Sequence, residues 1–153
     1  AAVEAVGQIG PEAAGLVPHI LPFLERSDNT ELRRSALDTL GLVAEGSPEA
    51  ADLATEVAQL LRRDPVPIVR ASAALTLGRL RAPGFDDDLR AALEDADQDV
   101  VAAALGAVGF LGADAEGLVP AVAATCIAGA TGNARAVAVG ALLKVGGEVE
   151  EQA

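Results

Sequence analysis

One apolar pattern returns again and again along this chain, and it restricts the possible folds more than any other feature. The clearest copy lies in Glu31–Ala44. Its apolar residues form one stripe on a helix of 3.6 residues per turn: Leu32, Ala36, Leu40 and Val43, with Leu37 beside them. The same offsets recur as Val69, Ala73, Leu77 and Leu80 with Ala74, as Val100, Ala104, Val108 and Leu111 with Leu105, and as Ala134, Ala138, Leu142 and Val145 with Val139.

Glycine marks the same place in successive copies, at Gly7, Gly41, Gly78 and Gly109. The spacings of 34, 37 and 31 residues (7 to 41, 41 to 78, 78 to 109) indicate a unit of two short helices and two turns. Glycine inside a helix costs about 1 kcal/mol relative to alanine, so we expect a close approach of a neighbouring helix at these positions. A unit this small cannot close its own core. The predicted fold is therefore all-α, a solenoid of stacked antiparallel helix pairs.

The repeats divide the chain into units. We expect one repeat domain over residues 1–153. Because the chain holds no methionine, we do not expect Ala1 to be a native start, and we expect the domain to be a fragment. The expected units are the second helix of a truncated repeat at 1–10, complete repeats at 11–45, 46–82, 83–113 and 114–147, and an acidic tail at 148–153.

Prolines and capping residues set the expected helix limits. The first helix of each unit is predicted at about 16–26, 48–63, from Asp86, and 118–128, and the second at 31–44, 67–80, 99–111 and 133–145. Pro22 should bend the first of these, which is expected to bury Leu16, Val17, Ile20, Leu21 and Leu24. Ser47 is expected to cap the helix that starts at Pro48, and residues 27–30 offer oxygens for the cap at 31.

One segment carries a family resemblance. In LLRRDPVPIVRASAALTLGRL, Leu60–Leu80, an acidic turn leads through Val-Arg into an alanine-rich helix that ends near Leu-Gly. This segment resembles a HEAT repeat of the short bacterial and archaeal kind. LEDADQDVV at Leu93–Val101 resembles the same turn, with Val101 where the family usually has arginine. The resemblance extends over essentially the whole chain and implies a right-handed α-solenoid. It leaves the function open, because HEAT-like arrays serve as adaptors, enzyme subunits and a few enzymes.

The resemblance also implies a role for the arginine that follows the first apolar residue of a second helix. In HEAT-like units this arginine typically reaches an acidic residue in a neighbouring turn. Arg33, Arg70 and Arg135 are therefore expected to pair with Asp28, Asp64 or Asp97 in an inter-repeat ladder, which we favour over a ligand-binding role. Val101 interrupts the ladder in the third unit.

The charge of the chain argues against two classes of partner. With 23 acidic and 11 basic residues the net charge is −12, whereas nucleic-acid backbones and anionic membrane surfaces attract basic faces. The acidic residues are spread over every unit, which favours a solvated outer face over an acidic docking site. The uncharged runs Val100–Ala113 and Gly117–Ala134 hold glycines and much alanine, so we assign them to tight helix packing and not to membrane spans.

No catalytic, cofactor-binding or metal-binding residue is predicted. His19, the single histidine, is followed by Ile20 and lacks the His-Glu pairs of iron-dependent HEAT-like hydroxylases, so we expect it on a helix surface. The chain has no Trp or Tyr for the aromatic-lined face of HEAT-like DNA glycosylases, and no glycine-rich phosphate loop. Cys126 is alone, which excludes an internal disulfide, and we expect it to be a small buried hydrophobe.

The resemblance places a partner on the second helices, which line the concave side of such solenoids. The outward positions there are Arg34, Asp38 and Leu42, then Ala71, Leu75 and Arg79, then Ala102, Gly106 and Phe110, then Ala136, Gly140 and Lys144. The candidate partner-binding residues are Arg34, Asp38, Leu42, Leu75, Arg79, Phe110 and Lys144. In the competing interpretation, further repeats or a second copy of the chain cover these outward positions.

The sequence therefore predicts a non-enzymatic adaptor that holds a protein partner and needs no cofactor. The alternative is an accessory or regulatory subunit of an enzyme, or a bilin-lyase-like enzyme whose active residues lie outside this fragment. We expect a cytoplasmic location. The acid-rich, lysine-poor composition resembles that of salt-loving archaea, and the frequent Ala, Gly, Val, Arg and Asp are equally typical of high-GC bacteria.

Overall fold

The computed structural model describes residues 15–25, 28–45, 47–127 and 132–151. These residues form helices joined by turns and contain no strand. The elements are α2 (Val17–Ile20), the 3₁₀ turn η2 (Leu21–Phe23), α3 (Thr30–Val43), α4 (Ala50–Arg63), α5 (Pro67–Leu80), α6 (Asp86–Ala92), α7 (Gln98–Leu111), the 3₁₀ segment η3 (Gly112–Leu118), α8 (Val119–Ile127) and α9 (Gly132–Glu151).

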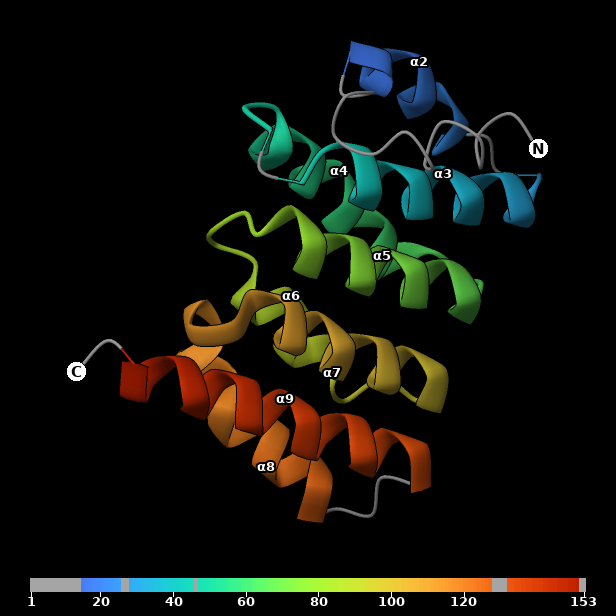
Figure 1. Ribbon diagram of the computed structural model, residues 1–153. Coiled ribbons are helices and arrows are strands. Elements are labelled where there is room, and N and C mark those ends of the chain that lie inside the picture. Colours follow the sequence, from blue (N-terminus) through green and yellow to red (C-terminus); the bar gives the residue numbers. More distant parts are fainter. Residues whose placement is uncertain (1–14, 26–27, 46, 128–131, 152–153) are drawn as a thin grey trace.

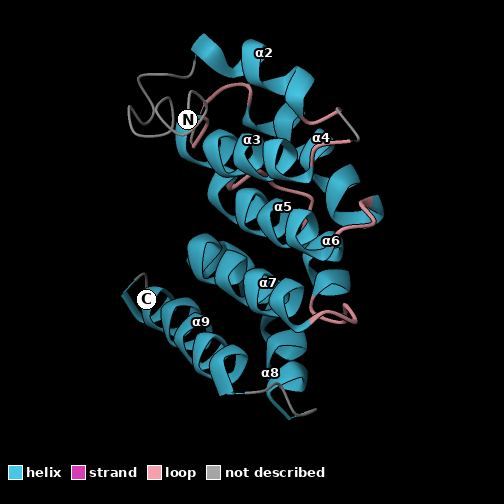
Figure 2. Ribbon diagram, turned by 90° about the vertical axis from the view of Figure 1, so that its right-hand side faces the viewer, coloured by secondary structure: helices cyan, strands magenta, loops and turns pink. Residues whose placement is uncertain are grey.

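Successive helices form pairs, and the pairs stack. Helix α4 packs on α5, α6 on α7 and α8 on α9, while α3, α5, α7 and α9 pack side by side in chain order. We call these four helices the B row, and α4, α6 and α8 the A row. Figure 2 shows the two rows along opposite sides of the stack. The predicted all-α solenoid is confirmed.

The core lies between the rows because the predicted apolar stripes face it. In α5 and α7 every stripe residue is buried, from Val69 to Leu80 and from Val100 to Leu111. In α9 the stripe is displaced, since Ala138, Ala141 and Val145 are buried whereas Val139 is 50% exposed. The prediction that Val139 flanks the buried stripe was wrong, because α9 turns Ala141 toward α7 instead.

Proline interrupts the first helix. The helix predicted over 16–26 is a four-residue α2 followed by η2, with Pro18 and Pro22 in their respective first turns. Proline has no N–H to continue an α-helical hydrogen-bond ladder, so the chain tightens into a 3₁₀ turn. Contrary to expectation, Leu16 is exposed and Leu21 only partly buried.

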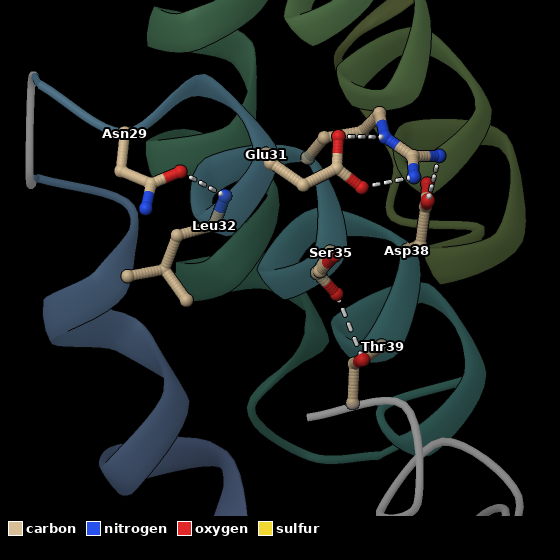
Figure 3. Close-up of polar contacts among 7 residues, drawn as sticks. Asn29, Glu31, Leu32, Ser35, Asp38 and Thr39 are labelled. Atoms are coloured by element: carbon tan, nitrogen blue, oxygen red, sulfur yellow. Dashed lines mark hydrogen bonds and ion pairs between the residues drawn. The ribbon is translucent and has the colours of Figure 1, made fainter. Parts of the chain in front are cut away.

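The two predicted caps have different outcomes. Asn29 caps α3, because its side-chain oxygen accepts a 3.0 Å hydrogen bond from the backbone N–H of Leu32 (Figure 3). Ser47 does not cap α4. That helix begins at Ala50, whose N–H donates to the Ser47 carbonyl in the preceding turn, and the Ser47 hydroxyl is buried without a hydrogen-bond partner.

Helix α9 is longer than predicted. It continues past Val145 to Glu151, so the start of the predicted acidic tail at 148–153 is helical. The predicted half-unit at 1–10, Gly7, and the turn at 129–131 lie outside the described residues.

The run Gln98–Ile127 is long and apolar enough, by length and composition alone, to cross a membrane. It is not one helix, however, because η3 separates α7 from α8 and Ala115 within it has the non-helical backbone angles φ −94° and ψ 16°. More than half of its most apolar window is buried inside the protein. Packing within the solenoid therefore accounts for its apolar composition.

The recurring glycines lie where neighbouring B-row helices meet, and the helices approach each other more closely at some of these glycines than at others. A Cβ atom on Gly78 would lie 2.5 Å from the Cα of Ala107, so α5 and α7 approach closely at this point. A Cβ atom on Gly41 would lie 3.2 Å from Cδ of Arg79. On Gly109 it would lie 3.9 Å from Cδ of Lys144, which is ordinary contact. Helix α9 therefore packs on α7 less closely than α7 packs on α5.

Gly78→Ala and Gly109→Ala should have different effects on stability. At Gly78 the new methyl group would overlap the α7 backbone, so we expect the free energy of unfolding to fall by about 1–3 kcal/mol. At Gly109 the methyl group fits, and the better helix propensity of alanine should leave stability unchanged or raise it by up to about 1 kcal/mol. Urea unfolding followed by circular dichroism measures both. Equal changes in the free energy of unfolding for the two variants would contradict the closer helix approach at Gly78 than at Gly109.

Leu40→Asp should unfold the neighbouring units. Leu40 is 0% exposed, so the substitution buries an unpaired charge and should cost about 4 kcal/mol or more. Leu42→Asp is the matched control, since Leu42 lies two residues away and is 41% exposed. Thermal unfolding compares the variants, and an unchanged melting temperature for Leu40→Asp would rule out the proposed core.

Candidate functional site

An ion pair joins α3 to the turn before α5. Arg33 donates from Nε to Oδ2 of Asp64 at 2.9 Å and from Nη2 to Oδ1 at 3.3 Å, and both side chains are about 5% exposed or less. Oδ1 of Asp64 also accepts the backbone N–H of Val66 at 2.9 Å. The carboxylate therefore fixes its own turn and holds the preceding unit through a bidentate contact.

A second ion pair repeats this geometry one unit later. Arg70 donates from Nε and Nη2 to the two carboxylate oxygens of Asp95, both at 2.9 Å. Its Nη1 also donates to the backbone carbonyl of Asp64 at 3.0 Å, so the two pairs are linked. The hydrogen bonds from Arg70 lower the pKa of Asp95 below its ordinary value, against the effect of burial, and the same contact raises the pKa of Arg70.

Two of the aspartates predicted to pair with the ladder arginines, Asp97 and Asp28, do not do so among the residues that the structure describes. Asp97 does not pair with an arginine, because its Oδ1 accepts the N–H of Asp99 at the start of α7. Asp28 is exposed and forms no ion pair within the described residues. The position of each aspartate relative to the next helix could have identified the correct partners. Asp64 lies five residues before Val69, and Asp95 lies five residues before Val100, where Val69 and Val100 are the first apolar residues of their helices.

The ladder does not continue between α7 and α9. Val101 occupies the arginine position and is buried, and the residue five places before Ala134 is Gly129. The predicted pairing of Arg135 involves a side chain outside the described residues. Sequence reasoning missed two other ties between the second and third units, from Arg62 to Asp88 at 2.6 Å and from Nη2 of Arg81 to the carbonyl of Leu111 at 3.1 Å.

The α3 end of the B row carries a local charge cluster. Arg34 donates to Glu31 at 3.2 Å and to Asp38 at 3.3 Å (Figure 3), which lowers the pKa of Glu31. Two of the predicted partner-binding residues, Arg34 and Asp38, are therefore already engaged with each other. Leu42, on the same outer face, is 41% exposed.

The other end of the B row contains an apolar groove of about 370 Å³ between α5, α7 and α9. It brings together three of the predicted partner-binding residues, Leu75, Phe110 and Lys144, with the predicted small positions Gly106 and Gly140. Four lining residues were missed, namely Leu105, Gly109, Val137 and Ala141. Val137 and Ala141 were missed because the exposed and buried faces of α9 are displaced from the repeat pattern.

Arg79 extends across the B row beside this groove. Its Cδ lies against Gly41 of α3, and its guanidinium carbon lies 5.1 Å from the centre of the Phe110 ring. That distance is within the range of a cation–π contact. The stacked arginine covers part of the ring, and Phe110 is still 40% exposed.

The part of the chain that the structure describes contains no group of three or more His, Cys, Asp or Glu side chains placed to hold a metal ion. His19 is exposed on α2. Cys126, predicted to be buried, is only partly buried and packs against the core.

Comparison with known proteins identifies the repeat. Residues 55–143 match a family model described as HEAT repeats, a match that covers more than half of the 153 residues. A search of the curated proteins returned no match.

Asp95→Asn should reduce the dependence of stability on pH. The lowered pKa of Asp95 in the folded protein means that its stabilising effect is complete above the unfolded value of about 3.9 and is lost as the pH falls through the folded value. The difference in free energy of unfolding between wild type and Asp95→Asn should therefore be largest near neutral pH and shrink below about pH 4. Urea titrations measure it, with the exposed Glu94→Gln as control. A difference that stays constant with pH would contradict the pairing with Arg70.

Proposed function

This chain belongs to the HEAT-repeat family, and we propose that it is a non-enzymatic scaffold that holds a protein partner on the outer face of the B row. HEAT repeats generally mediate protein–protein interactions. The observation that supports this face is the groove between α5, α7 and α9, because it places the partly buried Leu75 and the exposed Phe110 beside small residues.

The groove has the size and lining of a peptide-binding site. A volume of about 370 Å³ accepts a few side chains of a partner. Gly140 has open space where a Cβ atom would lie, so a partner backbone can come close there, while Leu75 and Phe110 supply apolar contact area. These are the features by which grooves between helices bind a helix or an extended segment.

The lining favours binding over catalysis. Lys144 is the single ionisable side chain among the residues that line the groove. General acid–base or nucleophilic catalysis needs a second positioned group, such as a histidine or carboxylate within hydrogen-bond distance, and the lining supplies none.

Leu75→Asp and Phe110→Asp should each abolish capture of the partner and leave the helix content unchanged. Both side chains line the groove and are only partly buried, so a charge there blocks apolar contact without entering the core. Capture is measured by affinity purification from the host, and helix content by circular dichroism. Thr55→Asp on α4 is the control, because Thr55 is exposed on the A row.

Capture that survives both groove variants would disprove the proposed site. Capture lost equally in Thr55→Asp would move the interaction away from the B row.

A further inference from the structure

The helices around the groove are less acidic than the chain as a whole. The whole chain has 23 acidic and 11 basic residues. Helices α5, α7 and α9 together contain four acidic residues, Asp99, Glu148, Glu150 and Glu151, and four basic residues, Arg70, Arg79, Arg135 and Lys144. Among the residues that line the groove, Lys144 carries the single charge. The groove therefore presents a positive charge although the chain is acidic.

The two cations beside the groove have no carboxylate partner within the described residues. Most other described arginines form ion pairs, namely Arg33, Arg34, Arg62, Arg70, Arg81 and Arg90. Neither Arg79 nor Lys144 is in such a pair, although the chain has an excess of carboxylates. Their charges are available to a ligand.

The placement of these cations defines a site at one level of the stack. Arg79, Phe110 and Lys144 occupy the same position of the repeat pattern in three successive B-row helices. The guanidinium lies 5.1 Å from the ring centre, and the Lys144 side chain lines the groove beside Gly109. A carboxylate at this end of the groove can therefore pair with Lys144 while neighbouring apolar groups enter the groove.

We propose that the groove binds an apolar segment of another protein that carries an aspartate or glutamate side chain. Its apolar residues pack on Leu75 and Phe110, and its carboxylate pairs with Lys144 and Arg79. This inference rests on the proposed function and adds the chemistry of the partner. A second copy of the chain fits less well, because a symmetric contact through this face would set the same cations against each other.

Within the described residues, fewer polar contacts join α7 to α9 than join α5 to α7, and the groove opens toward α9. Between α5 and α7 the Arg70–Asp95 pair and the close contact at Gly78 hold the helices together. Between α7 and α9, Val101 replaces the arginine, and Gly109 has only ordinary contacts. The looser contact between α7 and α9 leaves room for side chains of a partner, and Leu75 of α5 completes the lining of the groove.

Selection from a random peptide library tests the chemistry without knowledge of the partner. Phage-displayed peptides of about 12 residues, long enough for a helix or an extended segment, are selected on the full chain. Peptides that lose binding to Phe110→Asp are the groove binders. We expect them to combine Leu, Ile or Phe with at least one Asp or Glu. Groove binders without acidic residues, or with basic ones, would overturn this inference and leave the proposed function standing.

Charge exchange then locates the carboxylate. Fluorescence anisotropy with one selected peptide should show binding about tenfold weaker to Lys144→Glu, because an attraction is replaced by a repulsion, and an acid-to-lysine change in the peptide should restore it. Arg63→Glu makes the same charge change on an exposed A-row residue outside the groove and should leave the affinity nearly unchanged.

The remaining outcomes separate the two proposals. Equal weakening by Lys144→Glu and Arg63→Glu would show that net charge alone acts, and would overturn the carboxylate site. Selected peptides that all bind Phe110→Asp as well as wild type would contradict the B-row function itself. Sedimentation velocity of the unliganded chain should show a monomer, and a dimer that Phe110→Asp dissociates would assign the groove to a second copy instead.

Discussion

Each helix pair in this chain leaves an apolar face that the pair itself cannot cover, and the rest of the structure depends on this constraint. Helix α5 shows the result, since it packs on α4 within its pair and on α3 and α7 in the neighbouring pairs. Even polar residues of α5 are buried, and Thr76 is accommodated because its hydroxyl donates a 2.9 Å hydrogen bond to the Leu37 carbonyl in α3. The stability of each helix pair therefore depends on the neighbouring pairs. The contact between one pair and the next can be strong or weak independently of the other contacts.

The contacts between neighbouring B-row helices differ because two separate features strengthen them. A glycine allows the backbones to approach, and an arginine ties its helix to the turn of the next unit. Where α5 meets α7 both features are present, with Gly78 against Ala107 and Arg70 on Asp95. Asp95 also accepts the N–H of Asp97, so the same carboxylate sets the entry of the chain into α7. Between α7 and α9 the arginine is absent and the glycine makes no close contact, so these helices stand farther apart.

The fold could be predicted from the sequence because helix periodicity and proline positions are local signals. Helix α5 begins and ends at the predicted residues, Pro67 and Leu80. The site was predicted only in part, because its details depend on register across units. Asp97 and Asp95 are both acidic residues of one turn, and only alignment on the next helix distinguishes the capping residue from the partner of Arg70. Likewise, no local signal indicates that α9 turns Ala141, and not Val139, toward α7.

The same pattern explains how an acidic chain can keep the lining of the groove free of acidic residues. Acidic residues that open the A-row helix α6 or lie in the turns have structural uses, since they cap helices, interact favourably with helix N-termini and pair with arginines. The outer positions of α5, α7 and α9 need none of these contacts, so apolar and small residues can occupy them. Within the described residues, Arg79 and Lys144 form no ion pair with a carboxylate. In the proposed complex, these two charges are therefore the ones that select an acidic partner.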